Sequence, residues 1–399
     1  MVAVTAPPAS AAVSPRERRH SYVSTDVAVD AAVSERIDAF VRDVIRPIAP
    51  AMARGHGPSP KHLVGAAGEA GLAGILTPRD LGGAGGTHLE FASFIEAVAR
   101  EDASSAVILD VHLSVGTEPI IVFGNDDQKA RYLPRLARGE WLAGFALTEP
   151  AGGSDAAALQ TRAVRDGDAY RLSGTKTFIT GAGDADLYVV MARTGEGSRG
   201  ISAFLVEAHW PGVSTGVPLE KMGLHGSWTG ELVLDSVSVP EANRLGDEGF
   251  GFRVAMGTLD SGRVGISAQA VGIAQGALDV AVRVARERGA AGVDVDATAL
   301  ADMEARTVAS RLLTRHAATL VDAGGAVTRD AAVAKLYATD SCVAVAHAAF
   351  ELCAPESARA DHPAAVRLCD AKACQIYEGT NQIQRMVIAR ELLQPSKLQ

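Results

Sequence analysis

Apolar side chains recur along this chain at spacings that change twice. From about 34 to 144 they recur every three or four residues, as Ile37, Phe40, Val41 and Val44 do. That spacing places them on one face of a helix. The first third of the chain is therefore predicted to be helical.

The pattern between about 145 and 246 is typical of short strands. The runs 187–191 and 201–206 are rich in β-branched and other apolar residues and are bounded by Gly, Asp and Ser. Asp166-Gly167-Asp168 stands between two further runs, a composition that favours a hairpin turn. This part of the chain is predicted to form a β domain.

Beyond 251 the spacing is helical again, and the apolar stripes are long and rich in small residues. They comprise Ile266, Ala270, Ile273, Ala277, Ala281 and Val284, then Ala301, Ala305, Val308 and Leu312. Such stripes indicate a closely packed helical bundle. Strands do not alternate with helices and no repeat of 20–50 residues occurs, which argues against a dinucleotide-binding sheet and a solenoid.

The predicted fold is mainly α with a central β domain. We expect a disordered tail at 1–26, an N-terminal helical domain at 27–144, the β domain at 145–250 and the helical bundle at 251–399. The tail is rich in Ala, Pro and Ser and contains Arg16, Arg18 and Arg19, so a transit peptide is the alternative. It has no apolar core of a secretory signal, and we predict a cytoplasmic protein.

Composition excludes several classes of partner. The 399 residues are 47% hydrophobic and 21% charged, which is ordinary for a globular protein. The net charge of −9 argues against a nucleic-acid partner, because phosphate backbones require a basic surface. No run of 18 or more apolar residues occurs in the sequence, so no membrane span is expected.

Four cysteines lie in the last sixty residues, with His347 and His362 among them. Their spacing is not that of a metal finger, and we predict no metal site. We expect small buried side chains on helices instead, and nothing here requires an oxidising compartment. The four are Cys342, Cys353, Cys369 and Cys374.

Two segments could carry chemistry. The first, 145–155, has the sequence Phe-Ala-Leu-Thr-Glu-Pro-Ala-Gly-Gly-Ser-Asp. Its proline and glycines interrupt regular structure and leave backbone N–H groups and the hydroxyls of Thr148 and Ser154 available to a flat ring system and a diphosphate. An ordinary glycine-rich connection has the same composition, so the residues alone leave both interpretations open.

The second segment, 375–385, has the sequence Gln-Ile-Tyr-Glu-Gly-Thr-Asn-Gln-Ile-Gln-Arg. We expect one helix to end at Gly379 and another to start with Thr380 as its N-cap. Glu378 then lies in the connecting loop beside Ile376 and Tyr377. Apolar surroundings raise a carboxyl pKa, which suits a general base near neutral pH. A solvent-exposed glutamate at a helix end is the alternative.

Together these segments resemble those of the acyl-CoA dehydrogenase family, and the similarity extends over about 34–393. The stretches 221–224 and 259–265 agree as well. The resemblance implies a flavoprotein that uses FAD to desaturate an acyl thioester on CoA or an acyl-carrier protein. It also implies an N-terminal helical domain, a β-barrel-like middle domain and a C-terminal four-helix bundle. The electrons would go to an electron-transfer flavoprotein or a similar acceptor.

The resemblance also implies a role for each matched residue. For FAD these are Leu147 and Thr148 at the isoalloxazine, Ser154 at the phosphates, Phe178 over the ring, Thr180 near N5, and Arg288, Thr380 and Gln382 as further contacts. For the acyl thioester they are Ser154, Asp260, Arg263 and Gly379. Glu378 would take the α-proton while the β-hydrogen leaves as hydride, and its backbone N–H would polarise the thioester carbonyl. Family members often have Trp at the position of Phe178, which preserves stacking but loses an indole N–H. Some relatives place the base at the position of Gly262, which here cannot act as one.

Two stretches depart from the family. They are the ones that reach a neighbouring subunit's FAD. After Arg288 the chain continues 289–294 as Gly-Ala-Ala-Gly-Val-Asp, about five residues short and without the usual Phe and Gln. A glycine-rich stretch is replaced at 351–357 by Glu-Leu-Cys-Ala-Pro-Glu-Ser. Its carboxylates would repel a diphosphate. Besides a homo-oligomer (dimer or tetramer), a hetero-oligomer with a related chain is therefore possible.

Two other functions remain as alternatives. A flavin-dependent monooxygenase can share this fold but does not rely on a carboxylate at position 378, so the intact Glu378 favours the dehydrogenase. A non-catalytic partner subunit would have lost its own FAD, and the intact loop at 145–155 argues against that.

Overall fold

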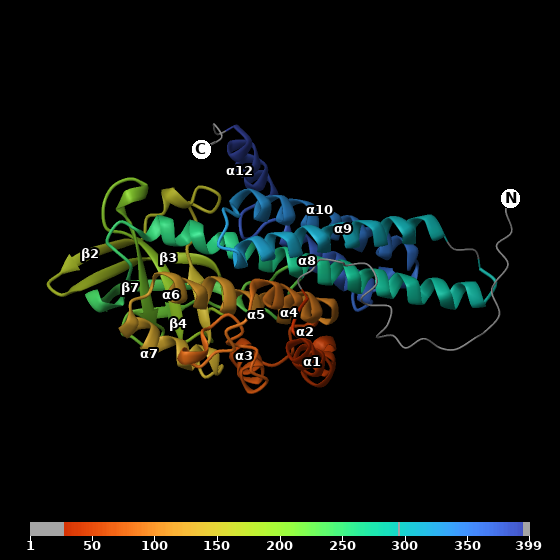
Figure 1. Ribbon diagram of the computed structural model, residues 1–399, viewed down its shortest axis with the longest axis horizontal. Helices are drawn as coiled ribbons and strands as arrows, with labels where there is room; N and C mark the ends of the chain where they lie inside the picture. Colours follow the sequence, from red (N-terminus) through yellow and green to blue (C-terminus); the bar gives the residue numbers. More distant parts are fainter. Residues whose placement is uncertain (1–27, 294–295, 394–399) are drawn as a thin grey trace.

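The computed structural model describes residues 28–293 and 296–393 (Figure 1). The tail predicted at 1–26 and Asp294 lie outside this range. Helices are followed by a sheet and then by long helices, as the sequence pattern predicts. Figure 1 shows the sheet at one end of an elongated molecule, with α8 running from the sheet to the opposite end.

The N-terminal region is helical. Its helices are α1 Ala31–Phe40, α2 Arg46–Met52, α3 Pro60–Glu69, α4 His88–Glu101, α5 Ala103–Asp110, α6 Glu118–Phe123 and α7 Asp126–Ala137. Ile37, Phe40 and Val41 are buried as predicted. Between α5 and α6 the backbone forms a π-helical stretch, Val111–Thr117, in which every residue is buried. Such wide turns often occur at functional sites, and this one packs against α8.

The middle region is an eight-stranded sheet. Its strands are β1 Ala143–Ala146, β2 Arg162–Asp166, β3 Ala169–Thr180, β4 Leu187–Arg193, β5 Ile201–Glu207, β6 Val213–Thr215, β7 Thr229–Pro240 and β8 Arg244–Leu245. The strand order is β6-β7-β3-β2-β4-β5-β8, and β1 pairs in parallel with β4. The hairpin predicted at 166–168 joins β2 to β3, with Gly167 at φ 65°. Strand β1 begins at Ala143, two residues before the predicted start of the β domain.

The C-terminal region is a bundle of long helices. They are α8 Gly251–Ala290, α9 Ala297–Asp322, α10 Thr328–Leu352, α11 Pro363–Cys374 and α12 Asn381–Leu393. Helix α10 packs against α8, α9, α11 and α12, and α4 from the first region packs along α8. The stripe predicted on α8 is buried apart from Val284, which is half-buried.

The stripe predicted on α9 is wrong. Ala301, Ala305 and Leu312 are exposed and Val308 is half-buried in this chain. The buried face consists of Met303, Thr307, Ser310, Thr314, Ala317 and Ala318. Its hydroxyls can be buried because each donates to the carbonyl four residues earlier, at 2.8–2.9 Å. A pattern based on apolar residues alone therefore selected the wrong face.

Two stretches of the core are long and apolar enough to cross a membrane by length and composition. They are Ala103–Phe123 and Gly251–Ala290, and 78% and 89% of their most apolar windows are buried inside the protein. Both are therefore core helices. The cysteines are free thiols: Cys342, Cys353 and Cys374 are buried and Cys369 is half-buried, and all but Cys353, which follows α10, lie on helices.

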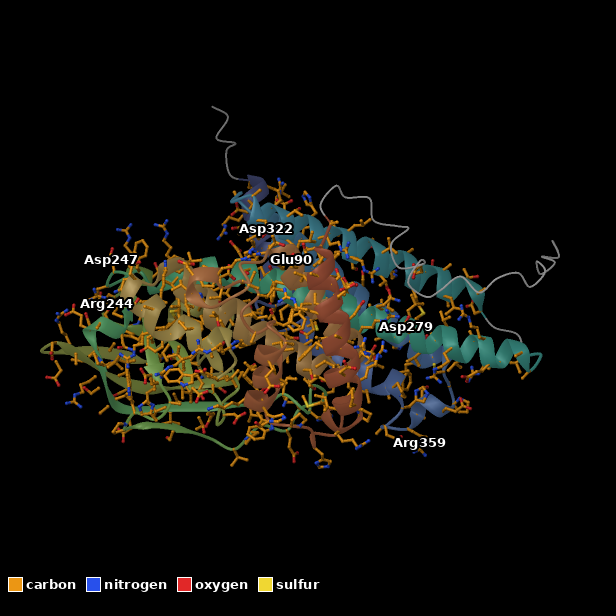
Figure 2. All side chains as sticks on the ribbon, turned by 60° about the horizontal axis from the view of Figure 1, so that its bottom comes forward. Glu90, Arg244, Asp247, Asp279, Asp322 and Arg359 are labelled. Carbon is orange, nitrogen blue, oxygen red and sulfur yellow. The ribbon has the colours of Figure 1, made fainter. Side chains whose placement is uncertain are left out.

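Polar contacts fix the N-terminal helices to the bundle. The Asp322 carboxylate at the end of α9 accepts the backbone N–H groups of His88 and Leu89 at 2.7 and 3.2 Å, so it caps α4. Figure 2 shows Asp322 beside Glu90, which closes the capping box of α4. The His88 ring lies between Asp322 and Glu118; burial opposes its charge, yet these two carboxylates raise its pKa to about 9.

Candidate functional site

A tight loop between α11 and α12 carries Glu378. Helix α11 ends at Cys374, five residues before the predicted end at Gly379. The chain then turns through two left-handed residues, Glu378 at φ 53° and Gly379 at φ 85°. A non-glycine residue in this conformation is uncommon and marks a position that the surrounding structure enforces. Thr380 caps α12 as predicted, because its hydroxyl accepts the Ile383 N–H at 3.2 Å.

The Glu378 carboxylate rests against a glycine of α8. A Cβ atom at Gly262 would lie 2.6 Å from Glu378 Oε2 and 3.2 Å from Val115 Cγ1. Any side chain at position 262 would therefore displace the carboxylate. Glu378 Oε2 is buried and has no hydrogen-bond partner in the described part of the chain.

Burial raises the pKa of Glu378 to about 7, while the charges of Arg263 and Lys335 act to lower it. Arg263 is buried and donates to Asp260 Oδ1 at 2.6 Å. Thr328 donates to the other oxygen of Asp260, also at 2.6 Å. The two residues predicted at the substrate thus form an ion pair, and both Asp260 oxygens already have protein partners.

A second carboxyl lies close by. Asp110, at the end of α5, is fully buried, and its Oδ1 would be 1.9 Å from a Cβ at Gly265, one turn along α8 from Gly262. Ser114 donates to Oδ1 at 3.1 Å, and Oδ2 has no partner among the described residues. Burial and the charge of Glu378 raise the pKa of Asp110 well above its usual value. This environment favours the protonated form of the Asp110 carboxyl.

The loop after β1 is fixed by a buried ion pair. Lys176 Nζ lies 2.7 Å from Glu149 Oε1 and donates to the Leu147 carbonyl at 3.1 Å. Glu149 also accepts the backbone N–H groups of Gln160 and Thr161 at 2.5 and 2.9 Å. Leu147 is buried, Thr148 is half-buried and Ser154 is exposed at the tip. The predicted flavin loop is thus rigid at its base and open at its tip.

Phe178 and Thr180 lie on β3 beside this loop. The Thr177 N–H donates to the Thr148 carbonyl at 2.9 Å, which joins the loop to the strand. The β3–β7 register shifts between Lys176 and Ile179, and within this irregularity Phe178 takes φ 58° and exposes 66% of its surface. An aromatic ring held out in a strained conformation is typical of a ligand-facing position. Thr180, two residues on, is half-buried at the end of β3, where it pairs with Thr229 of β7.

The remaining predicted contacts lie elsewhere. Gln382 is exposed on the first turn of α12, close in sequence to Glu378. Arg288 is 25 residues from Arg263 on the same helix, or about 38 Å away. Its guanidinium donates to the carbonyls of Leu352 and Ala354 at 2.5 Å and pairs with Glu356 at 3.0 Å. Within one chain Arg288 cannot reach the Glu378 site.

The structure therefore brings Glu378, Gly379, Arg263 and Asp260 together and joins the 147–154 loop to Phe178. Sequence analysis missed Lys335, Lys176 and Asp110, all fully buried. For Asp110 and Lys335 the signal is a single charged residue inside an apolar stretch, as in Ala334-Lys335-Leu336, whereas Lys176 lies between two threonines and has no such signal. In the described residues no cluster of three or more His, Cys, Asp or Glu is arranged to hold a metal ion.

Three family models match nearly the whole described chain. The N-terminal domain of acyl-CoA dehydrogenases matches residues 30–140, the middle domain 144–237 and the C-terminal domain 249–393. The chain belongs to the acyl-CoA dehydrogenase family. The predicted fold, with its helical, β and helical regions, is confirmed by this match.

Individual relatives are similar over most of their length. An acyl-CoA dehydrogenase of Bacillus subtilis (strain 168) is 45% identical over 89% of this chain and 95% of its own. An NADH-dependent acryloyl-CoA reductase of Anaerotignum propionicum is 42% identical over 82% and 84%. The solved structure of butyryl-CoA dehydrogenase from Megasphaera elsdenii superposes with a TM-score of 0.87 at 36% identity, over 92% of this chain and all of the other.

Acyl-CoA dehydrogenases use FAD, and this chain fits a flat flavin ring. Phe178 offers an exposed aromatic face, and the exposed loop tip at Ser154 offers a hydroxyl and little side-chain bulk. On the bundle side, Glu378 presents a carboxylate oxygen without a protein partner. Arg288, a further predicted FAD contact, is already bound by carbonyls of its own chain.

Proposed function

We propose that Glu378 is the general base with which this enzyme removes the α-proton of an acyl thioester. The enzyme class itself, FAD-dependent dehydrogenation of acyl thioesters, follows from the family. The observation that carries the proposal is the Glu378 carboxylate, which is held against Gly262 with a free oxygen and a pKa of about 7. A base with that pKa is half ionised at neutral pH, and its conjugate acid can release the proton again.

The proposed roles of the other residues follow from where they lie relative to Glu378 and to the loop after β1. FAD, when bound, would accept the β-hydrogen as a hydride. We assign its ring to Leu147, Thr148, Phe178 and Thr180, and its phosphates to Ser154. Thr380 and Gln382 stand beside Glu378 at the start of α12 and are assigned to further contacts with the cofactor.

For the substrate we assign the backbone N–H groups of the 378–379 turn to the thioester carbonyl and Arg263, held by Asp260, to the thioester side. Backbone donors fixed by a tight loop can stabilise the negative charge that develops on that oxygen as the α-proton leaves. Ser154 lies at the exposed entrance, where the carrier would approach.

Relatives guide the choice of partners. The B. subtilis relative and the butyryl-CoA dehydrogenase are named for CoA thioesters, so CoA is the first carrier to test and an acyl-carrier protein the second. One relative from Acetobacterium woodii is named as a subunit of a caffeyl-CoA reductase–Etf complex. We therefore propose an electron-transfer flavoprotein as the acceptor, and the cytoplasm as the location.

Assembly is a separate proposal. Since Arg288 lies about 38 Å from Arg263 along α8, it can serve a flavin only in a neighbouring subunit. Glu356 and two carbonyls already occupy it here. We propose that the enzyme is an oligomer whose cofactor is weakly held at its far end, either a homo-oligomer that loses FAD or a hetero-oligomer in which a second chain supplies the contacts.

The test of function is an anaerobic titration of the purified flavoprotein with acyl-CoAs and acyl-carrier proteins of graded chain length. A dehydrogenase bleaches the absorbance of the oxidised flavin without oxygen and releases the 2-enoyl thioester. A monooxygenase would leave the flavin oxidised under these conditions. A non-catalytic subunit would show no flavin absorbance at all.

A further inference from the structure

Lys335 is a charged residue buried in the middle of α10. Its side chain is completely inaccessible, and its Nζ donates to the Gly379 carbonyl at 2.8 Å and to Asn381 Oδ1 at 3.0 Å. Both acceptors belong to the turn that carries Glu378. Lysine is rarely buried without a paired charge, and no carboxylate is within ion-pair distance of this one among the described residues. Its position therefore needs a reason beyond packing.

The rest of the turn is held by the same helix. Asn381 donates to Thr339 Oγ1 at 2.9 Å and to Asp340 Oδ1 at 2.7 Å. Gln375, at the other end of the loop, also donates to Asp340 Oδ1 at 2.7 Å, and the Asn381 N–H closes the loop on the Gln375 carbonyl at 3.0 Å. Three residues of α10 thus hold both ends of a loop whose tip is Glu378.

Within this arrangement Lys335 has a distinct position. Thr339 and Asp340 contact the ends of the loop, whereas Lys335 reaches the carbonyl of Gly379, directly after Glu378. The Gln384 amide donates to the same carbonyl at 2.9 Å and to that of Glu378 at 3.2 Å. With these carbonyls turned toward donors in the bundle, the turn keeps the left-handed conformation that directs the carboxylate at Gly262.

We propose that Lys335 is a positioning residue for the dehydrogenation: it holds the Glu378 turn through the Gly379 carbonyl and supplies a buried positive charge that favours the carboxylate form of the base. The inference rests on Glu378 being the base. It adds two separable effects, one on geometry through the hydrogen bond and one on ionisation through the charge.

The charges around Lys335 are consistent with this role. Burial lowers the pKa of Lys335 to about 8, while Cys374 on α11, Glu378 and Asp340 act to raise it and Arg263 on α8 acts to lower it further. Lys335 in turn lowers the pKa of Glu378, together with Arg263. Lysine is therefore mostly protonated at pH 7, where Glu378 titrates, and an opposite charge nearby stabilises the ionised carboxyl.

The experiment is the pH dependence of anaerobic flavin reduction in single turnovers. Wild-type protein should lose rate below a midpoint near pH 7, as Glu378 takes up its proton. In Lys335→Met the midpoint should rise by about one pH unit, and the plateau rate should fall about tenfold because the turn is no longer held. Lys335→Arg keeps the charge and should return the midpoint to within a few tenths of a unit of wild type.

Two further variants separate the effects. Lys335→Gln keeps an N–H donor without the charge, so its midpoint should move while its plateau falls less; it also carries the test if Lys335→Met does not fold. Lys129→Met makes the same change of charge on α7, in another region of the chain, and should leave the profile unchanged. A structural role for Lys335 alone would lower the rate at every pH without moving the midpoint, and that outcome would overturn the proposal.

A spectroscopic measurement gives the ionisation without turnover. The C=O stretch of protonated Glu378 can be obtained by infrared difference against Glu378→Gln. In the wild-type protein it should titrate with the same midpoint as the rate of flavin reduction, and in Lys335→Met the midpoint should be about one pH unit higher. If Glu378→Gln itself bleaches at a normal rate, the base is elsewhere and the proposed function fails. If Glu378→Gln is inactive but the Lys335→Met midpoint does not move, only the inference on Lys335 fails.

Discussion

Two arginines on one helix show how differently the two ends of the cofactor site are built. Arg263 and Arg288 both belong to α8, about 38 Å apart. Arg263 is 5% exposed, pairs with Asp260 and faces Glu378, with its Nε unpartnered among the described residues. Arg288 is part-exposed and is bound by two carbonyls and Glu356 of its own chain.

The two arginines differ in how much of their proposed site a single chain can supply. Around Arg263, one chain supplies the proposed base Glu378, the nearby cations Arg263 and Lys335, and the loop that carries Glu378. Among the described residues, Arg288 is bound by two carbonyls and by Glu356 of its own chain. The diphosphate of FAD would have to displace these contacts. Buried residues of one chain thus make the contacts around Arg263, whereas we propose that the contacts of Arg288 with FAD depend on the assembly of subunits.

The largest effect on the rate of flavin reduction should come from replacing Glu378, beside Arg263. Glu378→Gln removes the base while preserving size and hydrogen-bonding capacity, so fold, FAD content and thioester binding should be retained. Flavin reduction should fall by roughly 10³–10⁴ or more, the upper range for a general base with no substitute nearby. Stopped-flow reduction by an excess of acyl-CoA measures it.

Asp110 is a second buried carboxyl close to Glu378, and the same variant tests it. Since burial and the charge of Glu378 raise the pKa of Asp110, and since it lies at Gly265 rather than Gly262, Asp110 should not replace Glu378. Bleaching at a near-normal rate in Glu378→Gln would show that the base is a different group.

The second-largest effect should be on the binding of FAD, through the contacts proposed for Arg288. Purified alone, the chain should carry less than one FAD per subunit, because several contacts of about 1–3 kcal/mol each weaken binding by orders of magnitude when lost. Flavin-to-protein ratio and mass in solution measure this. Glu356→Gln should raise FAD retention by removing a carboxylate beside Arg288, whereas Glu140→Gln, which changes an exposed carboxylate paired with Arg138, serves as the control.

Addition of a second, related chain distinguishes the two forms of the assembly proposal. A hetero-oligomer should take up FAD to one flavin per two chains, while a homo-oligomer should regain it from excess free FAD alone. A homo-oligomer that holds a full, tight FAD in every subunit would contradict both.

A third variant tests why position 262 is glycine. In Gly262→Ala the new Cβ would lie 2.6 Å from Glu378 Oε2, so the carboxylate must move, while the flexible side chain can do so without unfolding the protein. A displacement of about 1 Å can cost roughly 10² in rate. We expect that loss in flavin reduction with a melting temperature close to wild type. Equal loss of rate and stability would indicate a packing defect instead.

These comparisons also show which parts the sequence could predict. The order of helices, sheet and helices follows from the spacing of apolar residues, and the 166–168 hairpin follows from its turn residues, because each depends on local sequence. The stripe on α9 was wrong because Thr307, Ser310 and Thr314 satisfy their hydroxyls within the helix and are buried where a pattern of apolar residues would not place them.

In the site, the Glu378 loop and the flavin loop could be found from their motifs, whereas the residues that hold them could not. Lys335 and Lys176 act on carbonyls 44 and 29 residues away in sequence, and no local pattern encodes such contacts. Asp110 meets Gly265 only after α5 has packed on α8. Long-range packing decides these three positions.

The smallest effect should come from the face of the site that lies on the sheet. Thr180 ends β3 opposite Thr229, two residues after Phe178, and its hydroxyl is proposed to donate a hydrogen bond near flavin N5. Negative charge grows there as the flavin is reduced, so the bond should strengthen in the transition state. Thr180→Val preserves shape and β-branching and removes only the donor. Flavin reduction should slow about tenfold, within the ~1–3 kcal/mol expected for such a bond, with acyl-CoA binding and FAD content unchanged. Thr229→Val, across the strand pair, is the matched control. If both variants reduce at the wild-type rate, Thr180 does not face N5, and the sheet contributes stacking by Phe178 without a hydrogen bond to the reacting atom.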